Sequence, residues 1–521
     1  MMPQMNGNGG MSNMAISMMD MPSLASPSSV YVSRKQIIEM TNQHEQDVQL
    51  LRTRMEQDFE RYKLTPHINT DRVTGEPMPN YAVYTTNTPK VFADKVISWQ
   101  VLAELLLRVP HMQVEGHEEE QDNLKERFAI GNLKSADERL RRALQPSVRS
   151  QLAFYATVRG GYVGGRCLLV KNPRTGQTYA DIMPFDPLNV HWGIGANGLE
   201  WVCYKIKKTR AQIRSEYGVE LAGAAFTSGP YHSGSTDAEV EGVDVYDFYD
   251  GIINNVVTDG EDLKALTMHG SPRVPCFMTL VGPVPILQST TTSGLIAQVG
   301  ESIYAAARDT WKKKDDLLSI FQEIVERARA QTVVLESKDG KKTLDEDPFI
   351  HPTQIATQTG DKIYTLELQK MAQDVGAYLT IVLGEEQRAT VPYTTYGETP
   401  FQLSGFAITQ LRQATETVLS SRIEALSDCY LQIANLLHDQ FMTGRFDGMK
   451  LSGVDSKRAY FSQMITPEML ENTCDYEVKL VSQLPQDDQA RWMVAQTAKT
   501  LGLFADVDIH DKILGTQDAQ Q

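Results

Sequence analysis

The stretch GLIAQVGESIYAAARDTWKKKDDLLSIFQEIVERARAQTVVLE, residues 294–336, changes from a helical to a strand pattern near its end. Up to residue 331 the pattern predicts one long helix, about 55 Å in length at 1.5 Å per residue. The β-branched run TVVLE then begins a compact strand-and-turn insert, with a turn at Asp339-Gly340. We assign this insert to residues 332–363.

The sequence after the insert returns to helices. We predict a helix over 366–383, a loop containing Gly, Thr and Tyr over 384–400, and a long helix over 401–441. Two helices therefore flank a small insert, and a loop leads into a third long helix. The tail adds a strand over 476–481 and a helix over 486–501.

The first 293 residues combine helices with strands, which makes the fold class α+β. Amphipathic or buried helices are predicted over 33–62, 89–108, 118–143 and 146–159. From Tyr162 the apolar period changes to two, which predicts strands paired as hairpins and a meander up to His269, with one short helix over 209–217. A proline-rich stretch over 272–285 closes this region.

Composition excludes several classes of protein. The chain has 50 Lys and Arg against 66 Asp and Glu, a net charge of −16, which argues against a basic surface that grips nucleic acid. Five cysteines without a CxxC pair argue against a zinc ribbon or a disulfide scaffold. The most apolar run, 96–109, is shorter than a membrane helix and contains Glu104 and Arg108, so no membrane span is expected. Residues 1–32 resemble a flexible arm, not a signal peptide.

No motif in the sequence predicts a catalytic residue, a cofactor or a metal site. The run Gly193–Gly198 matches G-x-G-x-x-G, but an alternating strand pattern follows it where a dinucleotide site requires a helix, so a hairpin turn is predicted. Three weaker candidates have simpler explanations as a turn, a helix start and strand residues: Gly340–Thr343, the acidic run 506–511, and the trio Asp181, Asp186 and His191.

The run Trp311–Asp316 places three lysines and two aspartates on the long helix. Local ion pairs on a solvated helix face account for such a block. Pairing between the same helices of identical subunits is an equally good explanation, and neither excludes the other.

The ordered set of elements resembles the portal proteins of tailed bacteriophages over roughly residues 33–515. Three features carry the resemblance: hairpin sequences such as DIMPFDPLNVHWG in the N-terminal block, the helix–insert–helix–loop–helix order of 294–441, and the C-terminal segment LVSQLPQDDQARWMVAQTAKTLGLF. The resemblance implies an α/β wing, two stem helices flanking a small strand-containing clip, a long wing helix and a C-terminal helical crown.

The resemblance also implies a division of the chain: arm 1–32, first part of the wing 33–293, stem helix 294–331, clip 332–363, stem helix 364–383, tunnel loop 384–400, second part of the wing 401–481, and crown with tail 482–521. In these terms the candidate functional residues fall into three groups: the tunnel loop with Arg388, Tyr393, Tyr396 and Glu398; the stem charge block with Lys312, Lys313, Lys314, Asp315 and Asp316; and the clip with Lys338, Asp339, Lys341 and Lys342.

By resemblance, the expected function is that of a ring, commonly of twelve identical subunits, at one vertex of a virion capsid. Double-stranded DNA passes through such a ring during packaging and ejection, and the expected partners are the terminase large subunit, the major capsid or scaffolding protein and a head–tail adaptor. An acidic tunnel would hold phosphate weakly and let DNA slide. The alternatives are another head–tail connector or minor capsid protein and, in a different class, a nucleotide-binding cytosolic enzyme that uses the glycines at 193–198.

Overall fold

The computed structural model describes the following residues: 32–68, 70–71, 73–78, 82–110, 119–172, 175–196, 198–221, 242–284, 299–329, 333–336, 362–365, 373–391, 405–455, 459–470, 475–481, 492, 496–497 and 499–500. The predicted arm, most of the predicted clip and most of the predicted crown therefore lie outside these ranges. Helices and sheets are both present, so the predicted α+β class is confirmed.

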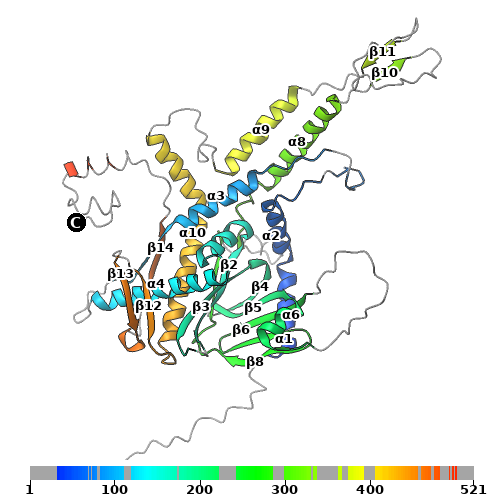
Figure 1. Cartoon of the computed structure of the whole chain (residues 1–521). Helices are drawn as coiled ribbons and strands as arrows, with labels where there is room; N and C mark the ends of the chain where they lie inside the picture. The colour runs from blue at the N-terminus through cyan, green and yellow to red at the C-terminus, as the bar shows by residue number, and fades with distance from the viewer. Residues whose placement is uncertain are drawn as a thin grey trace, which may run out of the picture.

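Two antiparallel sheets form the centre of the body (Figure 1). The smaller sheet has the order β3-β2-β9, with strands Thr178–Phe185, Tyr162–Lys171 and Cys276–Leu280. The larger has the order β4-β5-β6-β7-β8, with strands Val190–Gly195, Gly198–Lys208, Val243–Asp250, Ile253–Val257 and Asp262–Met268. The period-two pattern thus predicted the hairpins and the meander correctly. It missed β9, because prolines flank that five-residue strand and mask its pattern.

Helices surround these sheets and build the main core. The long α10, Gly405–Phe441, packs on β2 and β9, and its buried residues Leu426, Ile433 and Phe441 belong to the largest apolar cluster. The other helices of the body are α1 Arg34–Asp47, α2 Gln49–Tyr62, α3 Thr88–Leu102, α4 Glu119–Arg142, α5 Val148–Phe154, a π-helix Tyr155–Arg159 and α6 Arg210–Tyr217. A small sheet, β12 Met449–Val454 with β13 Tyr460–Ile465, packs on α4. In the described part of the chain, every helix is too short or too polar to span a bilayer.

The helix predicted over 89–108 ends earlier than expected. After α3 the backbone becomes extended at Ala103, and Glu104–Arg108 forms strand β1. This strand pairs antiparallel with β14, Glu477–Val481, so that Leu107 lies opposite Val478. Pairing with a strand more than 350 residues away overrides the local helical preference of the leucines. The predicted C-terminal strand is confirmed as β14.

The helix predicted over 294–331 is interrupted. Residue 299 is helical, 300–302 have no regular structure and 303–307 form turns. Helix α8 extends only from Arg308 to Arg329, about 33 Å at 1.5 Å per residue. Gly300 has a φ of +90°, and a Cβ at this position would lie 2.1 Å from the carbonyl oxygen of Val281. The close approach of the two backbones requires glycine and interrupts the helix at this point.

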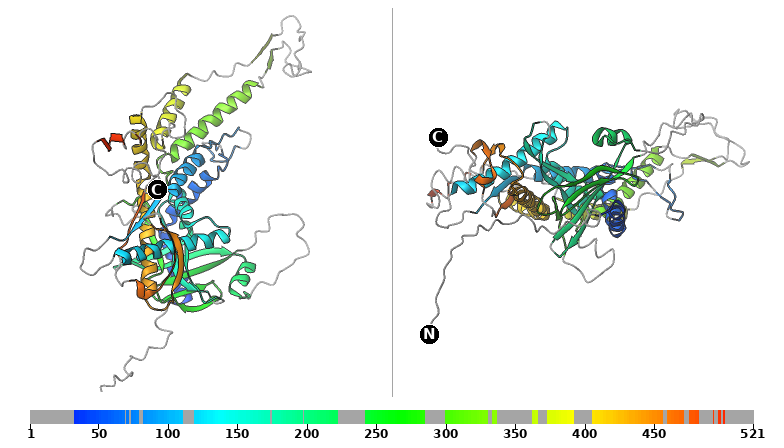
Figure 2. Two further views of the ribbon diagram at one scale, coloured as in Figure 1. Left: turned by 60° about the vertical axis from the view of Figure 1, so that its left-hand side comes forward. Right: turned by 90° about the horizontal axis from the view of Figure 1, so that it is seen from below.

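The following helix is shifted toward the C-terminus. Helix α9 extends over Gln373–Ala389, whereas the prediction ended it at residue 383 and began a loop at 384. Figures 1 and 2 show α8 and α9 leaving the body side by side. At their outer end lies a two-stranded antiparallel sheet of β10, Val333–Glu336, and β11, Lys362–Thr365.

Candidate functional site

A buried ion pair joins α8 to α9 close to the body. On α8, the Nζ atom of Lys314 lies 2.7 and 2.9 Å from the two carboxylate oxygens of Glu386 on α9. The indole N–H of Trp311 donates to the same carboxylate at 3.0 Å. Glu386 and Trp311 are completely buried and Lys314 is nearly so. Because an unpaired buried charge is costly, the two helices are held in the arrangement that keeps Lys314 against Glu386.

An extended segment, residues 82–88, follows α8 on another face; we call it the strap. Alternate backbone N–H groups of the strap donate to side chains spaced four residues apart on α8: Ala82 to Glu323 at 3.0 Å, Tyr84 to Ser319 at 2.9 Å and Thr86 to Asp315 at 3.0 Å. Two residues of extended chain advance about 6.6 Å and four residues of helix about 6 Å, so the two repeats match. The strap therefore runs antiparallel to α8.

The structure divides the charge block of α8 between solvent and interior. Lys314 and Asp315 are buried, and burial raises the pKa of Asp315 despite the hydrogen bond from the strap. Asp316 lies 2.8 Å from Nε2 of His67. Lys312 and Lys313 are exposed. Three of the five charged residues of the block therefore make contacts within the chain, and Lys312 and Lys313 present their charges to solvent.

The beginning of α8 is fixed to α2 by a second buried carboxylate. Asp58 on α2 is 1% exposed and accepts two hydrogen bonds from the guanidinium of Arg308, at 3.0 and 2.8 Å. The hydroxyl of Ser302 donates to the same carboxylate at 2.6 Å. This planar two-point contact sets the direction in which α8 leaves the body.

The predicted tunnel-loop and clip residues lie largely outside the described residues. Arg388 is the exception, and it lies in the last turn of α9 instead of in a loop, exposed and 2.6 Å from Glu385. The contacts of Glu386 with α8 keep this turn helical, which the sequence did not reveal. Outside the described ranges are Tyr393, Tyr396, Glu398, Lys338, Asp339, Lys341 and Lys342.

The outer parts of α8 and α9 carry large apolar side chains on their surfaces. Between 44% and 61% of each of these side chains is exposed: Ile320, Phe321 and Val325 on α8, and Tyr378 and Ile381 on α9. Exposed apolar groups of this size at a helix pair are typical of surfaces that bind another protein.

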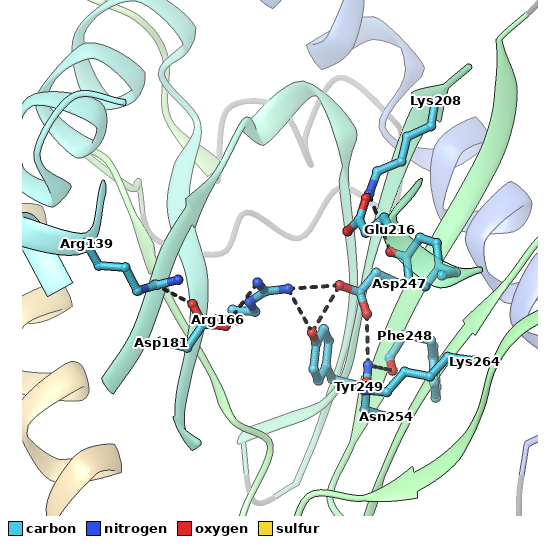
Figure 3. Close-up of polar contacts among 11 residues, drawn as sticks. Arg139, Arg166, Asp181, Lys208, Glu216, Asp247, Phe248, Tyr249, Asn254 and Lys264 are labelled. Atoms are coloured by element: carbon cyan, nitrogen blue, oxygen red, sulfur yellow. Dashed lines mark hydrogen bonds and ion pairs between the residues drawn. The ribbon is translucent and has the colours of Figure 1, made fainter. Parts of the chain in front are cut away.

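A chain of charged side chains connects the two sheets of the body (Figure 3). Arg166 on β2 lies 3.0 Å from Asp181 on β3 and 3.4 Å from Asp247 on β6. Asp181 also binds Arg139 on α4. Cations and carboxylates thus alternate from α4 across the smaller sheet to the larger one. Each carboxylate has two or more partners.

Neutral groups extend this network on β6 and β7. The hydroxyl of Tyr249 donates to Asp247 at 3.0 Å, and the amide of Asn254 donates to the other oxygen of Asp247 at 2.8 Å. Lys264 on β8 then donates to Asn254 at 3.0 Å. Burial, and secondarily the charge of Asp247, raises the pKa of Tyr249 well above its usual value, so this hydroxyl stays protonated and remains a donor.

Sequence reasoning missed Glu386, the strap and the network around Arg166. The four-residue spacing of Asp315, Ser319 and Glu323 did indicate a polar stripe, since residues four apart share one helix face. Nothing in the sequence identified their partners. The glycines at 193–198 form the β4–β5 hairpin turn as predicted, so no helix starts there. Within the described residues there is no group of three or more His, Cys, Asp or Glu side chains that could hold a metal ion.

Solved structures show a weak similarity to this chain. No family model and no curated protein matches the sequence. Two of the solved structures that align with this chain are described as the neck of an empty gene transfer agent particle computed with C6 symmetry and the virion of a native gene transfer agent particle. Each aligns over 83% of this chain and 90% of the other chain, with 10% identity and a TM-score of 0.41.

Proposed function

We propose that this chain is a structural subunit of a phage-like particle and, more specifically, a portal protein that forms a ring around a DNA channel. The observation that carries the proposal is the pair α8 and α9. The two helices leave an α/β body together, are joined at their base by the buried contact of Lys314 with Glu386, and have the sheet of β10 and β11 at their outer end.

In a ring, this arrangement would let each subunit contribute two helices to a common wall. The exposed apolar side chains of α8 and α9, such as Phe321 and Ile381, would be covered by the neighbouring subunit. The buried ion pair and the strap would keep the two helices of one subunit from separating under load.

The proposed role is passage of DNA and not catalysis. A net charge of −16 suits a channel that holds phosphate weakly, because like charges repel and shallow binding lets the duplex slide. We expect acidic residues to face the channel. We expect the packaging motor and, later, the tail adaptor to bind around the predicted clip.

Electron microscopy of the purified full-length chain tests the proposal. We expect class averages viewed along the axis to show a closed ring with a central hole wide enough for duplex DNA, and native mass spectrometry to give a whole number of subunits near twelve. A monomer or dimer at every concentration would contradict a ring. A ring whose hole is too narrow for DNA would favour another head–tail connector or a minor capsid protein.

A further inference from the structure

An open hollow of about 590 Å³ lies between α1 and the β4–β5 hairpin. In Figure 1 these elements lie at the end of the body opposite α8 and α9. Val32, Met40, Trp192 and Trp201 line it with apolar and aromatic surface. The hollow is therefore separate from the helix pair, and what it binds does not depend on whether the chain forms a ring.

The aromatic wall of the hollow depends on a glycine. Gly193 on β4 lies directly opposite Trp201 on β5. A Cβ on Gly193 would lie 2.1 Å from Nε1 of Trp201, so the indole lies across the bare backbone of β4. The first glycine of the G-x-G-x-x-G run thus serves to position Trp201 at the edge of the hollow.

His44 of α1 also lines the hollow. Its ring centroid is 4.1 Å from that of Trp192 and 6.4 Å from that of Trp201. Its Nδ1 lies 3.2 Å from Nδ1 of the fully buried His191. Burial lowers the pKa of His44 to about 4 and that of His191 to about 2, and the nearby Arg52 adds to both effects while Asp47 opposes it at His44. Both imidazoles are therefore neutral at pH 7.

The remaining charge of the hollow is negative. Glu39 and Asp47 of α1 both line it, whereas its lining contains no Lys or Arg. Lys35 lines an adjoining hollow on α1, which shares Glu39 and Gln43 with this one. Two carboxylates without a basic partner in the lining repel phosphate, so a nucleotide or a nucleic acid is a poor ligand for these two tryptophans.

We propose that this hollow binds an arginine side chain presented by a partner protein. A guanidinium is planar and weakly hydrated, so it stacks on an indole such as that of Trp201. Glu39 and Asp47 are eight residues apart on α1, about 12 Å along the helix axis. The N–H groups of the guanidinium therefore suit the carboxylate of one of them, while the other adds negative charge to the hollow. The aliphatic stem of the arginine suits the surface of Met40. A lysine ammonium matches the charge but lacks the flat face.

The arginine comes from another chain and not from the segment that precedes the hollow. Val32 lines the hollow, and residues 1–31 contain neither Lys nor Arg. The preceding segment therefore has no side chain of the required charge.

Calorimetric titration of the full-length protein with two peptides tests the proposal. The probes are acetyl-Gly-Leu-Arg-Leu-Gly-amide and the same peptide with citrulline, which has the shape of arginine without its charge. We expect the arginine peptide to bind about tenfold more tightly, and this preference to disappear in the Glu39→Gln/Asp47→Asn variant. The matched control Glu56→Gln/Glu468→Gln removes two exposed carboxylates elsewhere and should retain it.

A second pair of variants tests the geometry of the wall. Gly193→Ala should displace Trp201 and weaken the arginine peptide severalfold, whereas Gly251→Ala, where a Cβ meets nothing within 4 Å, should not. Equal affinity for the two peptides would overturn the proposal, and so would tight binding that survives the loss of both carboxylates. Binding of a synthetic peptide of residues 11–31 in place of the arginine peptide would assign the hollow to the chain's own N-terminal segment and also overturn it.

Discussion

The junction between α8 and α9 and the junction between the two sheets both rely on buried charge, but they distribute it differently. At the first, one carboxylate, Glu386, receives Lys314 and the indole N–H of Trp311. At the second, Arg166 lies between Asp181 and Asp247, each of which has further partners on other elements.

This difference predicts how each junction responds to the loss of one group. Removing Glu386 leaves the ammonium of Lys314 buried without the carboxylate that now faces it. Removing Arg166 leaves Asp181 with Arg139, and Asp247 with Tyr249 and Asn254. A junction that depends on one buried ion pair is therefore expected to lose more stability on removal of one group than a network of alternating cations and carboxylates.

The largest effect is expected from Glu386→Ala. Breaking a buried ion pair on one side typically costs about 3–5 kcal/mol, because the remaining charge is buried without its counter-ion. We expect the amides of α8 and α9 to lose protection in hydrogen exchange by the factor that corresponds to this free energy. The amides of β2 and β6 should keep their protection. Hydrogen exchange followed by mass spectrometry measures both regions in one sample.

The matched control removes both charges of this pair. In Lys314→Met/Glu386→Gln an apolar chain of similar length replaces the lysine, and the amide oxygen still accepts from Trp311. We expect protection of α8 and α9 to return close to that of the unmodified chain. Equal losses in the single and double variants would show that packing, and not charge pairing, holds the helices together.

A smaller effect is expected from Arg166→Met. The variant loses charge-assisted contacts to two carboxylates, but each carboxylate keeps other donors, so we expect a cost of about 2–3 kcal/mol in the free energy of unfolding of the body. Thermal denaturation measures it. Arg214→Met, which removes an exposed ion pair with Glu220, should change the midpoint little. A loss from Arg166→Met larger than that from Glu386→Ala would reverse the comparison.

The sequence predicted regular elements well and their partners poorly. The period-two pattern located the strands of both sheets except β9, and helical spacing located α4 and α10. The errors occur where distant segments meet: β1 is a strand because β14 pairs with it, and Gly300 interrupts a predicted helix because the backbone at Val281 approaches it. Local pattern contains no information about either contact.

The same limit applies to the candidate site. The block Lys312–Asp316 could be recognised in the sequence as charge on a helix. The partner of Lys314 is Glu386, which lies 72 residues further along the chain. The polar residues around Glu386 gave no indication of this role. Arg166 and Asp247 are 81 residues apart and alternate with apolar neighbours on strands, so nothing in their spacing marked them as a pair. Burial created both sites, and burial is set by the tertiary fold.

The smallest effect is expected at Tyr249, an uncharged member of the network around Arg166, and it depends on pH. Tyr249→Phe removes the hydroxyl that donates to Asp247, and we expect a cost of about 1–2 kcal/mol at pH 8. The folded-state pKa of Tyr249 lies well above 10, whereas the unfolded tyrosine ionises near pH 10. The stability that this hydroxyl contributes is therefore fully present below pH 10 and is lost as pH rises above it.

At pH 11 ionisation stabilises the unfolded state of the unmodified chain by about 1.4 kcal/mol, a gain that phenylalanine lacks. The cost of Tyr249→Phe should consequently shrink toward zero between pH 8 and pH 11, as measured by urea denaturation at each pH. Tyr460→Phe, at an exposed position, controls for the response of the rest of the chain. A cost that stays constant over this range would mean that Tyr249 ionises as easily in the folded protein as in the unfolded one, and the network would then be held by Arg166 and Asn254 alone.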